Sequence, residues 1–154
     1  MLYRRFDWHE HLQGVWGEYG SAQEAVRRFK ESVDAKPDLL EKNSPVRKHL
    51  RNAHKNLEGT YIVRLFAAFE AALRSFDRSQ HKNPKHETDA ATMIDQIGGK
   101  REHGIDPSIR EDAQAVRRVR NFWAHESDID PGPMTIDEAR ARLQKYLSEL
   151  PETW

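Results

Sequence analysis

A long apolar stripe between positions 46 and 78 is the feature that most constrains how this chain can fold. Six residues there recur at intervals of three or four: Ile62, Leu65, Phe66, Phe69, Leu73 and Phe76. At about 100° per residue they share one face of a helix, as expected when that face is buried. A loop containing Pro37 and Pro45 precedes the stretch, so we expect a core helix from Val46 to about Arg78.

Capping signals predict where other helices begin. Ser21 and Glu24 form the Ser-x-x-Glu pattern of a capping box, and apolar residues then recur at helical spacing until Pro37. Thr135 and Glu138 form a second capping box, ahead of the apolar positions of a final helix. We therefore expect one helix before the long core helix and another at the end of the chain.

Two more helices lie between these elements. The segment TDAATMIDQIGG predicts a short helix closed by its glycines. Asp106 and Pro107 are typical of an N-cap and a first helical position, and the helix they open should run to about Trp123 or His125. No segment has the two-residue period of a strand, so the sequence predicts an all-α, up-and-down bundle of four to five helices.

Length and composition favour a single helical domain over residues 1–154. Charged residues make up 32% and hydrophobic residues 37%, a balance that suits helices with one apolar stripe each or a subunit that shares its core with a partner. The first 20 residues contain five aromatic side chains: Tyr3, Phe6, Trp8, Trp16 and Tyr19. We interpret residues 1–45 as an aromatic arm, or a short helix that packs its aromatic side chains, followed by an extra helix, and residues 46–150 as the core.

Composition also excludes several classes of protein. The formal net charge is zero, so a nucleic acid would have to bind a local basic patch rather than a globally basic surface. There is no cysteine, which excludes disulfides and thiolate metal sites. No apolar run approaches the roughly 20 residues of a membrane span, so we expect no membrane association and a location in the cytoplasm.

The sequence predicts neither a cofactor nor a metal ion. No glycine-rich phosphate loop is visible, and Gly98 and Gly99 fit a helix stop. Four histidines invite a metal hypothesis: His9, His11, His81 and His86. Because we find no carboxylate–histidine spacing of a known ligand set beside them, we interpret them as separate surface imidazoles.

The segment VRRVRNFWAHESD contains the best candidate site. If Val116 marks the apolar stripe of its helix, Arg120 falls about 40° away and lies within that stripe. A guanidinium at such a position is costly unless an anion or an acceptor meets it. His125 would lie about 140° from Arg120 on an unbroken helix, so both can address one phosphate only if the helix ends between them or a second subunit contributes.

These residues suit cleavage of a phosphodiester bond in RNA. A free imidazole titrates near pH 6.5, so His125 can take the proton of a 2′-hydroxyl or protonate the leaving 5′-oxygen. Arg120 can hold the phosphate, and the amide of Asn121 can orient either partner. The products would be a 2′,3′-cyclic phosphate and a 5′-hydroxyl, with no metal required.

The spacing itself carries little information, because four other pairs share it: Arg4/His9, Arg5/His11, Arg47/His54 and Arg74/His81. In its context, however, the segment Arg120-Asn121-Phe122-Trp123-Ala124-His125 resembles the Arg-x4–6-His motif of the HEPN (higher eukaryotes and prokaryotes nucleotide-binding) superfamily. In that family the motif ends the penultimate core helix, and an earlier long helix carries an acidic residue, as in IVRLFAAFEAALRSF. The resemblance covers roughly residues 46–150.

This resemblance implies a metal-independent endoribonuclease that acts as a homodimer, with Arg and His from each subunit in one composite cleft. Such proteins serve as toxins of toxin–antitoxin pairs or in antiviral defence, so RNA and an antitoxin protein are the implied partners. Some relatives have lost catalysis. The alternative is therefore an inactive helical module that binds RNA, a nucleotide or a partner protein.

Neighbouring residues have both functional and structural interpretations. Glu70 either orients Arg120 or His125, or is an i,i+4 partner of Arg74. Arg117 and Arg118 either guide RNA or pair in solvent with Glu111 and Asp112. For the two aromatic side chains, Phe122 is the better candidate for stacking on a base, and Trp123 for a core or dimer contact.

Overall fold

A computed structural model describes residues 4–125 and 129–154. These residues form five α-helices and one short 3-10 helix: α1 Arg5–Ala35, η1 Pro37–Leu39, α2 Pro45–His81, α3 Ala90–Gln96, α4 Pro107–Ala124 and α5 Ile136–Leu147. Within the described residues there is no β-strand, only an isolated bridge between Arg4 and Thr153. The predicted all-α fold is confirmed.

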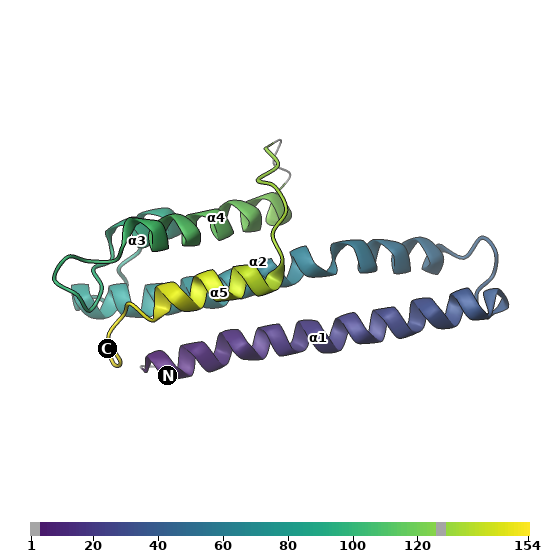
Figure 1. Ribbon diagram of the computed structural model, residues 1–154, viewed down its shortest axis with the longest axis horizontal. Helices are drawn as coiled ribbons and strands as arrows, with labels where there is room; N and C mark the ends of the chain where they lie inside the picture. Colours follow the sequence, from purple (N-terminus) through teal and green to yellow (C-terminus); the bar gives the residue numbers. More distant parts are fainter. Residues whose placement is uncertain (1–3, 126–128) are drawn as a thin grey trace.

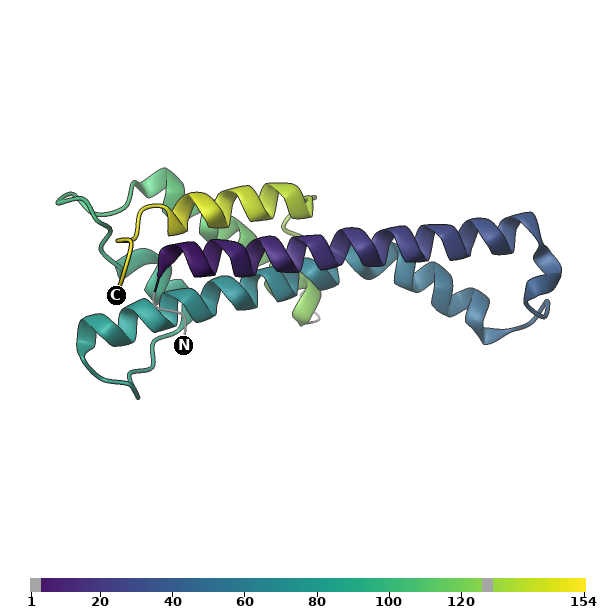
Figure 2. The same cartoon turned by 90° about the horizontal axis from the view of Figure 1, so that it is seen from below.

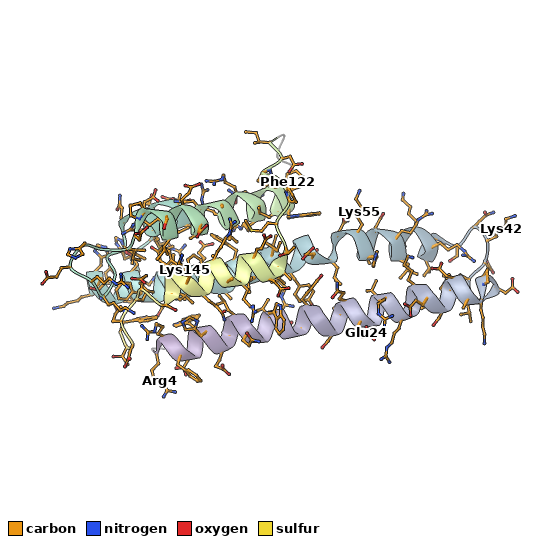
Figure 3. The ribbon with its side chains drawn as sticks, viewed as in Figure 1. Arg4, Glu24, Lys42, Lys55, Phe122 and Lys145 are labelled. Carbon is orange, nitrogen blue, oxygen red and sulfur yellow. The ribbon has the colours of Figure 1, made fainter. Side chains whose placement is uncertain are left out.

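The helices alternate in direction along the chain. In Figure 1, α1 and α2 run antiparallel, α4 lies above α5 and the C-terminal half of α2, and α5 returns alongside α1 and α2. The C-terminal part of α1 and the N-terminal part of α2 extend beyond the other helices as a two-helix hairpin, which Figure 2 shows from below. Glu24 and Lys55 are labelled on this hairpin in Figure 3. No residue between 45 and 58 is buried.

The core is centred on α2, as its apolar spacing predicts. All six stripe residues from Ile62 to Phe76 are buried. Apolar residues of α4 and α5 join the same cluster: Ile109, Ala113, Val116, Val119, Ile136, Ala139, Leu143, Tyr146 and Leu147. Long-range contacts between α2, α4 and α5 therefore place the end of α4 against the middle of α2.

The predicted aromatic arm is wrong, because one continuous helix runs from Arg5 to Ala35. Ser21 does not cap a helix: its hydroxyl donates to the carbonyl of Gly17 inside α1. Trp8, Leu12 and Val15 are spaced as one helical face and belong to the same core as α2. The N-terminal half of α1 is therefore part of the bundle, because its apolar face packs against the core. Tyr3, also assigned to the arm, lies outside the described residues.

The starts of α4 and α5 agree with the capping signals. The side chain of Asp106 accepts a hydrogen bond from the backbone N–H of Ser108, and Pro107 is the first helical residue. Thr135 and Glu138 form the expected reciprocal capping box. Glu58 of α2 adds a further acceptor, 2.9 Å from the backbone nitrogen of Ile136. Asp106 thus fixes the start of α4, and Thr135 with Glu58 fixes the start of α5, where the segment after α4 ends.

Candidate active site

The apolar face of α4 brings Arg120 to the bundle. The helix buries the stripe that ends with Val116 and Val119, and Arg120 follows one residue later on that face. Its side chain is 29% exposed, as expected for a guanidinium at the margin of the core. The predicted position of Arg120 on the stripe is confirmed.

The guanidinium of Arg120 is held on three sides. Its Nη2 lies 3.8 Å from a carboxylate oxygen of Glu70, and its Nη1 donates to the side-chain oxygen of Asn121 at 2.9 Å. The Cζ atom lies 5.6 Å from the centroid of the Phe66 ring. The buried Nε has no hydrogen-bond partner among the residues that the structure describes. The guanidinium is therefore oriented, and because the side chain is 29% exposed, its Nη groups retain N–H bonds that an anion could accept from.

Glu70 contacts both Arg74 and Arg120 in the structure. Its other carboxylate oxygen accepts from Nη2 of Arg74 at 2.9 Å, the i,i+4 contact expected within α2. The same carboxylate faces Arg120 from the neighbouring helix. One negative charge thus lies between two guanidinium groups, which leaves a formal charge of about +1 at this point. The excess favours an anion at the margin of the cluster.

His125 is the first residue after α4. The last residue of α4 is Ala124, and His125 is the C-cap with extended backbone angles of φ −133° and ψ 145°. Its backbone N–H still donates to the carbonyl of Asn121 at 2.9 Å. The required helix end therefore lies between Arg120 and His125. No hydrogen bond joins their two side chains within residues 4–125 and 129–154, and His125 is exposed.

The two arginines one turn earlier have structural partners. Arg117 donates through Nε to the side-chain oxygen of Gln114 at 2.6 Å, and Arg118 pairs with Glu111 at 2.5 Å. Asp112 forms an ion pair with Arg142 of α5 and not with Arg117. The solvated-pair interpretation thus holds for Arg118, whereas Arg117 is anchored differently.

The aromatic pair Phe122 and Trp123 marks the end of α4. Their ring centroids are 5.6 Å apart in an edge-to-face arrangement, and Figure 3 shows Phe122 near the C-terminal end of α4. Trp123 is 40% exposed, so it is not a core residue, and the dimer contact expected as the alternative stays a prediction. Its ring covers Gly59 of α2, where a Cβ would approach to 2.1 Å. The absence of a side chain at Gly59 lets the ring pack against the α2 backbone.

Candidate metal ligands occur elsewhere on α2, which corrects the sequence interpretation. His81 and His86 are not separate imidazoles, because their rings stack with centroids 3.9 Å apart. Both face the carboxylate of Asp77, and the three side chains form a group that could hold a metal ion. The i,i+4 spacing of Asp77 and His81 could have indicated from the sequence that these two side chains lie together. The contribution of His86 depends on the turn after α2.

Comparisons with known proteins add no relative. No family model matches the chain, and neither the curated proteins nor the solved structures contain a match. No described helix is long and apolar enough to cross a membrane. The resemblance to HEPN proteins therefore rests on the motif from Arg120 to His125 and on the order of the helices.

Proposed function

We propose that the chain is a metal-independent endoribonuclease that uses Arg120, Asn121 and His125. One observation carries the proposal: the guanidinium of Arg120, oriented by Asn121 and Glu70, stays 29% exposed one turn before α4 ends. The helix end frees His125 from the direction that an unbroken helix would impose. The guanidinium of Arg120, which can hold an anion, and the exposed imidazole of His125 therefore lie at the same end of α4.

The proposed reaction is an internal transfer at phosphorus. A neutral imidazole takes the 2′-hydroxyl proton while the 2′-oxygen attacks the phosphorus atom, and the bond from phosphorus to the 5′-oxygen breaks. A protonated imidazole gives its proton to the departing 5′-oxygen. Arg120 stabilises the charge that builds on the phosphate oxygens. The products are a 2′,3′-cyclic phosphate and a 5′-hydroxyl.

Two chains suit this chemistry better than one. The acid and the base are separate groups, and each chain offers one histidine in the motif. A twofold homodimer would bring a second His125 to a shared cleft. The 40% exposure of the Trp123 ring, two residues from His125, supports a contact surface beside the motif.

The resemblance to HEPN proteins extends the proposal to a biological role. We propose that the enzyme acts in the cytoplasm, as a toxin with an antitoxin partner or as part of antiviral defence. Arg117, Arg118 and Phe122 would contact the RNA around the cleaved bond. The side-chain contacts of Arg117 and Arg118 lie on α4, so RNA phosphates would compete with Gln114 and Glu111 for them.

A second candidate function is an inactive helical module that binds RNA, a nucleotide or a partner protein. The carboxylate of Glu70 favours this function. It already lies 3.8 Å from the guanidinium of Arg120 and would compete with an RNA phosphate for it. This module would form a tight dimer or hetero-complex and would show no RNA turnover from about pH 5 to 9.

Cleavage of single-stranded RNA in EDTA distinguishes the two functions. We expect the wild-type chain to cleave and His125→Ala to lose cleavage by at least about 100-fold, because the proton transfers fail. The melting temperature should change little, since His125 is exposed. His54→Gln, at an exposed histidine of the hairpin, is the matched control. Equal cleavage by His125→Ala would remove this residue from the mechanism.

A further inference from the structure

A second polar cluster lies at the C-terminal end of α2, away from the motif on α4. Asp77 and His81 stand one helical turn apart, so their side chains share a face of the helix. His86 comes from the segment between α2 and α3. Together they form the group of possible metal ligands within the described residues.

The turn after α2 brings His86 back to the helix. Lys82 adopts the left-handed region, with φ 49° and ψ 33°, and so reverses the chain. The side chain of Asn83 accepts from the backbone N–H of Lys85, and the backbone carbonyl of Asn83 accepts from that of His86. Arg78 then donates through Nε to the carbonyl of His86 at 3.1 Å. These contacts fix the imidazole over Asp77 before any ion binds.

The two imidazoles direct their Nε2 atoms at one carboxylate. His81 Nε2 lies 3.4 Å from Oδ1 of Asp77, and His86 Nε2 lies 3.4 Å from Oδ2. All three ligand positions lie within 4.8 Å of one another. Two ligands at about 2.0–2.1 Å from a tetrahedral Zn²⁺ are themselves about 3.4 Å apart. The spacing of each histidine–carboxylate pair therefore matches a shared ion.

Asp77 is a buried carboxylate. The residue is 8% exposed, and its Oδ2 has no hydrogen-bond partner in the part of the chain that the structure describes. A buried carboxylate is costly unless a positive charge meets it. A single cation held between the three side chains would supply that positive charge.

We propose that Asp77, His81 and His86 bind a divalent transition-metal ion such as Zn²⁺. Imidazole and carboxylate ligands suit first-row ions of this kind. The side chain of His81 is 54% exposed, so it can rotate and bring its ligand nitrogen closer to the ligand atoms of Asp77 and His86. This site is distinct from the proposed cleavage site and does not depend on the ribonuclease proposal.

The fourth coordination position would open into a cavity of about 770 Å³. The three ligands line this cavity together with side chains such as Gln80, Thr88 and Gln96. The Oγ1 of Thr88 hydrogen-bonds to Nε2 of His86 at 2.9 Å, and metal binding through Nε2 would replace this bond and leave the hydroxyl to contact a water molecule on the ion. Three protein ligands with an open position are typical of sites where a metal meets water or a small ligand.

Titration of Zn²⁺ into untagged, chelator-treated protein tests the proposal without RNA. We expect one ion per chain by calorimetry, a dissociation constant in the micromolar range or below, and a higher melting temperature with Zn²⁺. Asp77→Asn and His86→Gln should each weaken binding by about 100-fold or more, because each removes a ligand. His54→Gln is the control, since His54 lies on the same helix about 35 Å along its axis from Asp77.

Co²⁺ supplies a second readout that folding alone would not change. Its visible spectrum should alter on binding to the wild-type chain and to His54→Gln, and should remain that of the free ion with His86→Gln. His86 lies outside the helices, so this variant keeps the test valid if Asp77→Asn fails to fold. Absence of one-to-one Zn²⁺ binding by the wild-type chain would overturn the proposal. Unchanged binding by a folded Asp77→Asn or by His86→Gln would do the same.

Discussion

Glu70 and Asp77 are carboxylates on the same face of α2, two turns or about 10 Å apart. The side chains around them favour ligands of opposite charge. Glu70 lies between the guanidinium groups of Arg74 and Arg120. Asp77 lies between the imidazoles of His81 and His86 and has a buried oxygen without a hydrogen bond within the described residues. The first cluster has cations in excess and fits an anion, whereas the second presents lone pairs and fits a cation.

The two clusters are joined by a short series of contacts. Arg74 donates through Nη2 to the carboxylate of Glu70 at 2.9 Å and through Nη1 to the backbone carbonyl of Thr88 at 3.2 Å. The hydroxyl of Thr88 in turn contacts His86. The comparison teaches that one helix face can serve opposite ligands, because neighbouring elements supply the remaining charges. Variants that affect one cluster and spare the other are the way to test it.

The largest expected effect comes from Arg120→Ala. Removing the guanidinium should lower RNA cleavage in EDTA by about 100-fold or more, a cost typical of losing a group that stabilises transition-state charge. Zn²⁺ affinity should stay within about 3-fold of wild type, since Arg120 touches none of the proposed metal ligands. Single-turnover cleavage and calorimetry measure the two effects. Arg28→Ala, at an exposed arginine that pairs with Glu24 on the hairpin, is the control.

A smaller loss is expected from Glu70→Gln, which keeps the size of the side chain and removes its charge. Arg120 would lose one of its orienting contacts, so kcat should fall by about 10-fold with little change in KM. The split between kcat and KM comes from steady-state cleavage rates. If Glu70 serves only Arg74, cleavage will match the wild-type rate while the melting temperature falls. Such a result would confine this carboxylate to a structural role.

The smallest effect concerns the junction that positions the end of α4. Gly59→Ala places a methyl group where the Trp123 ring lies, at 2.1 Å in the present geometry. Overpacking of this kind should lower the melting temperature by about 3 °C or more and move the ring into solvent, which tryptophan fluorescence can follow. Zn²⁺ binding should be unchanged. A melting temperature equal to that of the wild-type chain would show that the contact is dispensable.

Most of the fold was predictable because its helices carry local signals. The core positions of α2 repeat every three or four residues, and Asp106 and Thr135 begin α4 and α5 as their capping patterns indicate. The N-terminal helix was not predicted correctly. Gly14, Gly17 and Gly20 weaken its local helical preference, and packing against α2 and α5 offsets that cost.

The two clusters were predictable to different degrees. The angular position of Arg120 follows from helical periodicity alone, so sequence reasoning found it. Its approach to Glu70 needed the packing of α4 on α2, which the periodicity leaves open. The cluster around Asp77 depends on the left-handed Lys82, and a lysine gives no local indication of that conformation.

The chemical ends of cleaved RNA test the central claim most directly. Wild-type protein incubated with single-stranded RNA in EDTA should produce 2′,3′-cyclic phosphate and 5′-hydroxyl ends, and His125→Ala should produce neither. These ends follow from attack by the 2′-oxygen with proton transfer by imidazole. Intact RNA after incubation with the wild-type chain, or fragments with 5′-phosphate and 3′-hydroxyl ends, would contradict the proposed function.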